Sequence, residues 1–266
     1  MAVDFNPSVS RTVSNQLANN SAQISSGKRI NSASDDVAGF GVAVELNTRI
    51  RSQDASITNA VNGISLVQTA EGGLRQISDG LQQLRELTIQ SGNSILNTSD
   101  RQSLQQQADE ILAQIRDNIS ATRFNGIQPL SQTGSTELQL GADARDQVSV
   151  TTLNLNDSLD SAGLNSFDLS NPSNFESSLN ALDQSLGIIE SAAADFGASR
   201  NRLDSAINTL EVSNQAQTAS ASRIEDADVA KAISELIHNR LLQQSIIAMQ
   251  AQANSQRGDV LALLSG

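Results

Sequence analysis

The residues that could carry chemistry are few, and their spacing does not form an active site. The chain contains one histidine, His238, and no cysteine, which excludes a structural zinc site, a disulfide framework and a Cys–His nucleophile. Two carboxylate clusters, Asp35-Asp36 and Glu225-Asp226-Ala-Asp228, lack the regular oxygen spacing and the bend glycine of a calcium-binding loop. We interpret both clusters as helix caps or as ion-pair partners of Arg29, Arg223 and Lys231.

Other catalytic motifs are absent from the sequence. Gly39-Phe-Gly41 has no third glycine and no strand before it, so it does not indicate a dinucleotide-binding loop. There is no Walker lysine, no GxSxG and no HExxH motif. His238 stands near Arg240 without an acid or a nucleophile at catalytic spacing, and we interpret it as a surface or packing residue. We therefore expect a protein that is not an enzyme and that uses neither cofactor nor metal.

The composition excludes further classes of function. The formal net charge is -12 and aromatic residues make up 2% of the 266 residues, so the chain is poorly suited to neutralise phosphates or to stack on bases. No run approaches the roughly 18 consecutive apolar residues of a membrane span. The segment Met1–Pro7 has neither the basic nor the apolar region of a secretory signal. These features favour a cytoplasmic protein, or one exported without a cleaved signal, that binds neither nucleic acid nor membrane.

Long helices are the elements that must position the remaining residues. In the C-terminal half, apolar residues recur at alternating intervals of three and four, which predicts a heptad seam along one helix. Arg200 is the one charged position of this seam and is expected to set the register or to extend to the edge. The seam consists of Leu179, Leu182, Leu186, Ile189, Ala193, Phe196, Arg200, Leu203, Ile207 and Leu210.

The N-terminal half contains a similar seam, followed by another helix. Glu71 and Ser78 interrupt this seam, whose members are Ile57, Ala60, Ile64, Val67, Leu74 and Leu81. The next helix is indicated by apolar residues at 3.6-residue spacing between Leu104 and Ile119, with Asp100 as the expected N-cap. Phe124-Asn-Gly-Ile then predicts a turn.

The middle of the chain follows a different pattern. Between about residues 128 and 172, apolar and polar residues alternate around turn residues, in Leu138-Gln-Leu, Val148–Leu153 and Asn154-Leu-Asn. This alternation predicts a small β-hairpin region. Asn171-Pro172 marks the return to helix. We therefore predict a mainly α protein, a long α-helical coiled-coil bundle formed by the N- and C-terminal halves, with a small β-hairpin region in the middle.

The last segment, Ile224–Leu264, is amphipathic. Ile233, Leu236, Ile237, Leu241 and Ile247 are expected to share a face, and the chain then ends in Val260-Leu-Ala-Leu-Leu. An apolar stripe at an exposed terminus is usually buried by a partner. Since the seams of both halves also lack an evident partner, we expect them to be buried between copies of the chain.

One segment near the N-terminus closely resembles a known signature. Ser25–Gly39, which reads SSGKRINSASDDVAG, is similar to the N-terminal signature of the bacterial flagellins. Further segments resemble the family's motifs in the same order and at the same spacing, over roughly residues 20–130 and 180–266. They are Asn62–Gly72, Thr122–Gly126, Ser222–Asp226, Leu241–Gln244 and Ala251–Asn254.

The resemblance implies how the chain is organised. In the flagellins the two chain ends form an inner coiled-coil region called D0, and the flanking helices with a β-hairpin form D1. Only about 45 residues separate the two conserved halves here, so the resemblance implies a short form with D0 and D1 alone. The implied divisions are an N-terminal D0 arm and spoke (1–40), N-terminal D1 helices with the hairpin (41–175), a C-terminal D1 helix (176–220) and a C-terminal D0 arm (221–266).

The resemblance also implies a function and partners. The chain is expected to be a structural subunit that polymerises into the flagellar filament for swimming motility, or, as the alternative, a hook–filament junction protein. Its partners would be copies of itself, an export chaperone, the hook-associated junction proteins and the filament cap protein. It would be secreted through the flagellar export apparatus and reside in the extracellular filament.

The apolar seam positions are the residues that we expect to form the self-assembly core. Contacts that do not close on themselves generate helical polymers. The predicted set is Ile57, Ile64, Val67, Leu74, Leu81, Leu179, Leu182, Leu186, Ile189, Phe196, Leu203, Ile207, Leu210, Ile233, Leu236, Ile237, Leu241, Ile247, Leu261, Leu263 and Leu264.

The chain departs from the family pattern at two places. The segment ahead of Ser25 is shorter than usual by about two helical turns, which implies a shorter N-terminal D0 helix. Leu81–Leu87 resembles the segment that Toll-like receptor 5 recognises: Gln82, Arg85, Glu86 and Leu87 match, but Gln83 replaces an arginine. Loss of the guanidinium predicts weaker receptor recognition. The alternative interpretation is that this segment serves only to pack protofilaments.

Overall fold

A computed structural model of the chain describes residues 7–141 and 145–265. The chain divides into two compact units. Unit 1 comprises the described residues up to Ile50 together with those from Gln215 onward, and unit 2 comprises Arg51–Asn214. None of the described helices combines the length and apolar character needed to cross a lipid bilayer. Of the segment Met1–Pro7, residues 1–6 lie outside the described residues.

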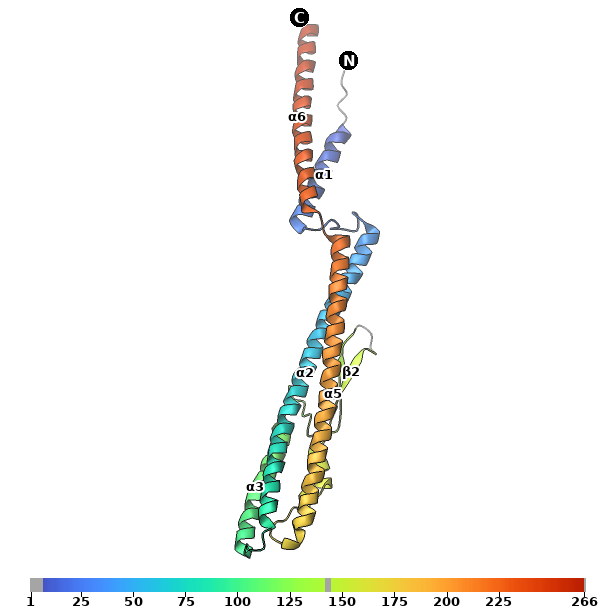
Figure 1. The fold of residues 1–266 in the computed structure, drawn as a ribbon. Coiled ribbons are helices and arrows are strands. Elements are labelled where there is room, and N and C mark those ends of the chain that lie inside the picture. Colours follow the sequence, from blue (N-terminus) through green and yellow to red (C-terminus); the bar gives the residue numbers. More distant parts are fainter. Residues whose placement is uncertain (1–6, 142–144, 266) are drawn as a thin grey trace. The chain divides into compact units, whose positions relative to one another are not determined.

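Unit 2 is built on three long helices that run side by side (Figure 1). These are α2 (Val37–Ser91), α3 (Thr98–Ala121) and α5 (Phe175–Glu225), of which α2 and α5 continue into unit 1. Apolar side chains from all three helices form one core. Its fully buried or nearly fully buried members include Val67, Leu74, Ile77, Leu81, Leu84, Ala108, Ile115, Ile119, Leu182, Ile189, Phe196 and Leu203. The predicted helical fold class is confirmed.

The seam of α5 is centred differently from the prediction. Leu182, Ile189, Phe196 and Leu203 are buried as a heptad seam requires, but Ala193 and Arg200 are exposed. The residues one position before Leu186, Ala193 and Arg200 are buried, and they carry the small side chains of Ser185, Ala192 and Ser199. Small side chains let neighbouring elements approach the helix closely, so the buried stripe is rotated toward them.

Arg200 lies at the edge of the bundle. Its guanidinium is 3.7 Å from the carboxylate of Glu71 on α2 and 3.9 Å from that of Asp204 one turn further along α5. A long side chain that extends to the edge in this way keeps its charge in water while its methylenes cover the bundle. Placement of Arg200 within the seam was therefore wrong, and its extension to the edge is confirmed.

The connection from α2 to α3 is fixed by polar groups. Asn97 is the N-cap of α3, and Asp100 is the third helical residue, whose carboxylate accepts a hydrogen bond from the backbone N–H of Asn97. This capping box replaces the expected cap at Asp100 itself. The buried guanidinium of Arg101 donates to the carbonyl oxygens of Ser91 and Asn93. These bonds tie the end of α2 to the start of α3.

The turn expected after α3 is present. Phe124 and Ile127 pair as an isolated antiparallel bridge, and the two residues between them have positive φ, 48° at Asn125 and 84° at Gly126. Asn-Gly is the pair that adopts this conformation most readily. The turn therefore forms as its sequence predicts.

The predicted β-hairpin consists of β1 (Gly134–Gln139) and β2 (Gln147–Thr152), paired antiparallel with Leu138 opposite Val148. Leu138 packs against Gly63 of α2, and a β-carbon at position 63 would collide with the Leu138 side chain. The amide of Asn59 donates to the carbonyl of Gln139 at 3.0 Å. A helix glycine thus provides the space in which the hairpin approaches the bundle.

The chain after the hairpin is helical rather than extended. Asn154, expected to continue the alternating pattern, is the N-cap of the short helix α4 (Leu155–Ser161). Two 3-10 turns, η1 (Leu164–Ser166) and η2 (Pro172–Asn174), then lead into α5. The expected return to helix at Asn171-Pro172 is confirmed.

Unit 1 contains two helices from opposite ends of the chain, α1 (Pro7–Ser26) and α6 (Val229–Ser265), which pack side by side in opposite directions (Figure 1). Their least exposed positions recur at intervals of three and four, as in a coiled coil. We call this set the arm seam: Val13, Leu17, Asn20 and Ile24 of α1, with Ala232, Leu236, Asn239, Gln243 and Ile246 of α6. The seam includes asparagine and glutamine as well as aliphatic residues.

Candidate junction and assembly surfaces

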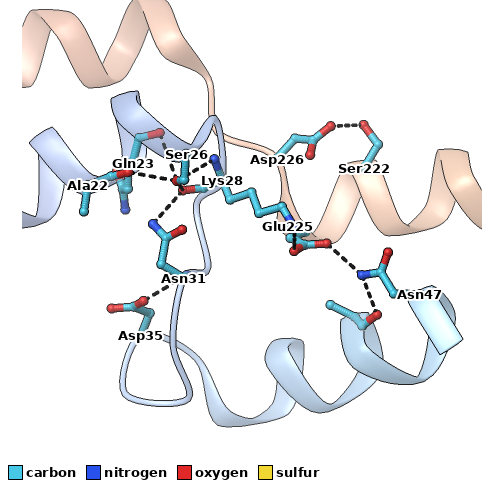
Figure 2. Close-up of polar contacts among 11 residues, drawn as sticks. Ala22, Gln23, Ser26, Lys28, Asn31, Asp35, Asn47, Ser222, Glu225 and Asp226 are labelled. Atoms are coloured by element: carbon cyan, nitrogen blue, oxygen red, sulfur yellow. Dashed lines mark hydrogen bonds and ion pairs between the residues drawn. The ribbon is translucent and has the colours of Figure 1, made fainter.

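The two most distinctive sequence segments, Ser25–Gly39 and Ser222–Asp226, meet in unit 1 (Figure 2). Lys28 and Asp226 form an isolated antiparallel bridge. On one side of it the N–H of Arg29 donates to the carbonyl of Glu225 at 2.7 Å, and on the other the N–H of Ala227 donates to the carbonyl of Gly27 at 2.9 Å. The backbone leaving α1 is thus bound to the backbone that joins α5 to α6.

Gly27 provides the turn that brings the chain into this bridge. Its φ is +71°, and its N–H donates to the carbonyl of Gln23 at 2.9 Å. Glycine is the residue that most readily ends a helix in this left-handed conformation. The hydroxyl of Ser26 accepts the N–H of Lys28 at 3.1 Å, which holds the first residue after the turn.

Side chains from two other segments, Lys28 and Asn47, converge on Glu225 (Figure 2). Its carboxylate pairs with the ammonium of Lys28 and accepts a hydrogen bond from the amide of Asn47 on α2 at 3.1 Å. The hydrogen bond from Lys28 has the largest effect and lowers the pKa of Glu225; partial burial opposes it, and Asn47 adds to it. The guanidinium of Arg29 donates to the carbonyl of Ile224 at 2.6 Å. The junction is therefore connected through both side chains and backbone.

The carboxylates of Asp35 and Asp36 organise the turn that leads into α2. Asp35 accepts the N–H groups of Asn31 at 3.0 Å and Ser32 at 2.9 Å, and these backbone hydrogen bonds lower its pKa. Asp36 accepts the N–H of Gly39 at 2.9 Å. A β-carbon at Gly39 would lie 2.7 Å from the buried side chain of Ile30. Gly39 thus serves close packing at the start of a helix.

The interpretation of the acidic clusters as caps and ion-pair partners is confirmed for several members. Asp228 accepts the N–H of Lys231 at 3.0 Å at the start of α6, and Asp36 lies 4.0 Å from Arg29. Lys28, the partner of Glu225, was not among the expected partners. The described residues contain no group of three or more histidine, aspartate or glutamate side chains that could hold a metal ion.

The predicted self-assembly positions of the helical bundle lie inside the chain's own core. Val67, Leu74, Leu81, Leu182, Ile189, Phe196 and Leu203 are buried in unit 2. Ile57, Ile64, Leu179, Leu186, Ile207 and Leu210 are partly buried. The expectation that these seams lack partners within one chain was wrong, because α2, α3 and α5 pack against one another. Their apolar contacts stabilise the subunit itself.

The predicted positions on α6 are mostly exposed. Ile233, Ile237, Leu241 and Ile247 retain 42%, 53%, 58% and 59% of their accessible surface, and Val229 retains 45%. We call these five residues the aliphatic stripe of α6. Leu236, expected on the same face, is partly buried in the arm seam. The side chains of Leu261, Leu263 and Leu264 lie outside the described residues.

The segment compared with a receptor-recognition motif lies on α2. Gln82, Gln83 and Glu86 are exposed, whereas Leu87 is buried and Arg85 pairs with Asp183 of α5. Part of the segment therefore contributes to the bundle, and Gln83 lies on its free surface.

Two features of the ends were not recognised in the sequence. Lys28 and Asn47 converge on Glu225 although they are 19 positions apart and far from it along the chain. Asn20 and Asn239 are 8% and 7% exposed, which is unusual for asparagine. Their heptad spacing relative to Val13 and Ala232 was the signal available in the sequence.

These observations define a coiled-coil structural protein whose two chain ends are paired. Residues 7–135 match the model of the bacterial flagellin N-terminal helical region, and residues 179–264 match that of the bacterial flagellin C-terminal helical region. The chain belongs to the bacterial flagellin family.

Relatives match along nearly their whole length. A flagellin of Halalkalibacterium halodurans is 34% identical over 91% of this chain and 89% of its own. A flagellar filament 33 kDa core protein of Treponema phagedenis is 33% identical over 96% of this chain and 95% of its own.

Solved structures show the same fold. The crystal structure of Bacillus cereus flagellin aligns with a TM-score of 0.52 and 26% identity, over 57% of this chain and 88% of that one. A putative flagellar hook-associated protein from Vibrio parahaemolyticus aligns with a TM-score of 0.62 over 72% of this chain and 100% of that one. At 14% identity, the second similarity concerns the fold alone.

Proposed function

We propose that this chain is the repeating structural subunit of a bacterial flagellar filament and that it acts in motility without catalysing a reaction. The observation that carries the proposal is the aliphatic stripe of α6, which stays exposed although α6 packs against α1 from the other end of the chain. Relatives that span nearly the whole chain include flagellins and a flagellar filament core protein. A subunit of such a polymer needs a stable body and an unsatisfied apolar surface, and the chain has both.

The stripe supplies the driving force for association. Complete burial of an exposed isoleucine, leucine or valine is worth about 1.5–3 kcal/mol, and the members of the stripe retain about half of their accessible surface. Their burial against neighbours would therefore contribute about 1 kcal/mol each. A contact between different surfaces of identical subunits does not close on itself and generates a helical polymer.

The divisions inferred from the family fit this role. We assign residues 1–40 and 221–266 to the D0 arms, and residues 41–175 and 176–220 to D1, with no outer domain. The two units divide inside α2 and α5, near Ile50 and Gln215, rather than at the ends of these helices.

The proposed partners and location follow from the same role. Besides its own copies, the chain would contact an export chaperone, the hook-associated junction proteins, the filament cap protein and, in a vertebrate host, Toll-like receptor 5. It would leave the cell through the flagellar export apparatus without a cleaved signal and reside in the extracellular filament.

A hook–filament junction protein is the second candidate, favoured by the fold similarity to a putative hook-associated protein. The two candidates differ in what the pure protein forms. A filament subunit elongates without limit, whereas a junction protein is used in few copies and does not form long filaments alone.

The test is assembly of the purified full-length chain under salting-out conditions, observed by electron microscopy. Long filaments are expected, and their absence even with filament seeds would reject the filament role. A variant with I237S and L241S removes two members of the stripe and should raise the critical concentration. The Q252S variant changes an exposed polar residue of the same helix and should assemble like the unmodified chain.

A further inference from the structure

The pairing of α1 with α6 uses the less apolar of the two faces that α6 offers. At 100° per residue, the aliphatic stripe is centred about 110° around the helix from the arm seam. The seam face of α6 carries Asn239 and Gln243 among Ala232, Leu236 and Ile246, whereas the face of the stripe carries its five aliphatic side chains with Arg240 and Gln244 between them. Burial of apolar area alone would favour the stripe as the face that packs on α1.

Two asparagines occupy the seam on which α1 and α6 meet. Asn20 of α1 is 8% exposed and Asn239 of α6 is 7% exposed. Both line an open groove of about 470 Å³ between the helices, together with Gln16, Ser234, Glu235 and His238. Every residue of this lining is polar, so the surroundings of the two amides can satisfy their hydrogen bonds.

The alternative pairing would take the amide of Asn20 out of its polar groove. If α6 turned so that the stripe covered α1, Asn20 would leave the polar groove and lie beside the aliphatic side chains of the stripe and the long side chain of Arg240. A buried amide without a hydrogen-bond partner is costly. A single asparagine at a seam position is known to fix the register of coiled coils for this reason.

We propose that Asn20 and Asn239 select the face of α6 that pairs with α1 and thereby keep the aliphatic stripe free for a neighbouring copy of the chain. The face selection is a property of the single chain. The use of the free stripe by a neighbouring copy rests on the proposed function.

The test exploits the absence of cysteine from the chain. Two reporter pairs are introduced into the full-length protein, V13C with Q243C on the seam and V13C with Q244C on the side of the stripe. Under mild oxidation, the seam pair should cross-link in preference to the other pair. In an N20L/N239L background the ratio of the two cross-links should fall by roughly tenfold, the size expected when a buried amide no longer opposes the aliphatic face.

Matched variants separate face selection from loss of folding. N19L changes an exposed asparagine beside Asn20 and should leave the ratio unchanged, and circular dichroism checks that each variant keeps its helix content. N20A/N239A removes both amides without adding apolar surface and should shift the ratio in the same direction by less. An unchanged ratio in N20L/N239L, or no preference in the unmodified background, would overturn the proposal.

Assembly gives the second measurement. N20L/N239L should raise the critical concentration for filament formation, because the stripe would be occupied within the chain. If the unmodified chain forms no filaments, the proposed function fails while the cross-link ratio still decides the face selection. Filaments from N20L/N239L at the unmodified critical concentration, with the cross-link ratio shifted, would overturn the role of the free stripe.

Discussion

Glu225 is the residue at which three segments of the junction meet. Its side chain is 14% exposed, against 46% for Lys28, so water screens the ion pair from the lysine side. The lowered pKa of Glu225 means that the folded junction favours the charged carboxylate. The resulting stability is present above the usual glutamate pKa and is lost as the pH falls through the lower folded-state value.

The E225Q substitution should weaken the junction near neutral pH. The N–H groups of Arg29 and Ala227 form the backbone bridge, and their protection from hydrogen exchange should fall about two- to fivefold. This corresponds to about 0.5–1 kcal/mol for a partly exposed ion pair such as Lys28–Glu225. Acidification well below pH 4.5 should reduce protection in the unmodified chain and leave E225Q little changed.

E45Q is the matched control, because Glu45 pairs only with Arg49 on the exposed surface of α2 among the contacts described. It should leave exchange at Arg29 and Ala227 unaltered. Equal protection in E225Q and the unmodified chain would show that the backbone bonds alone hold the junction.

Gln83 allows a direct test of receptor recognition at the residue scale. Its side chain is exposed on α2, so Q83R should fold normally and restore a guanidinium able to make bidentate hydrogen bonds. The monomeric variant should activate Toll-like receptor 5 more strongly than the unmodified chain in a cell reporter assay. Q90R adds the same charge at an exposed position outside the segment and should not, and equal responses from both variants would remove the special role of position 83.

At the scale of elements, the glycines of α2 decide how closely its neighbours approach. A β-carbon at Gly80 would lie 2.8 Å from Cγ1 of Ile115, a buried residue of α3, whereas one at Gly72 would meet nothing within 4 Å. G80A should therefore destabilise the bundle by about 1–3 kcal/mol through overpacking. The higher helix propensity of alanine offsets this loss by up to about 1 kcal/mol.

Urea unfolding of the full-length chain measures this difference. G72A gains the same helix propensity without a collision and should be neutral or stabilised by up to about 1 kcal/mol. If G80A proves as stable as G72A, α3 can shift away from α2 at no cost, and close packing at Gly80 is not required.

The helical seams and the hairpin were predictable because each leaves a local period in the sequence. Heptad spacing located Leu182, Ile189, Phe196 and Leu203, which are buried, but it could not choose between Arg200 and Ser199 as the next seam position. That choice depends on which neighbour packs against α5, and a single sequence does not contain this information. The convergence of Lys28 and Asn47 on Glu225 was hidden for the same reason, since it arises only when the two ends of the chain meet.

At the scale of the whole molecule, stability and assembly use different residues. The core of unit 2 lies entirely between Ala60 and Leu203, so it does not depend on the terminal helices. The exposed aliphatic residues of α6 contribute little to the folding of one chain and are available to neighbours. The bundle therefore retains its buried core without α6, and the exposed residues of α6 remain for contacts with other copies.

Deletion of residues 228–266 tests this division. The truncated chain should keep a cooperative thermal transition, because the buried side chains of unit 2 are all retained, and should remain monomeric by light scattering. No filaments should form under conditions in which the full-length chain assembles, since the aliphatic stripe and the partner of α1 are both removed. Filaments from the truncated chain would show that the bundle surface alone drives polymerisation, and loss of the thermal transition would show that α6 is needed for the bundle to fold.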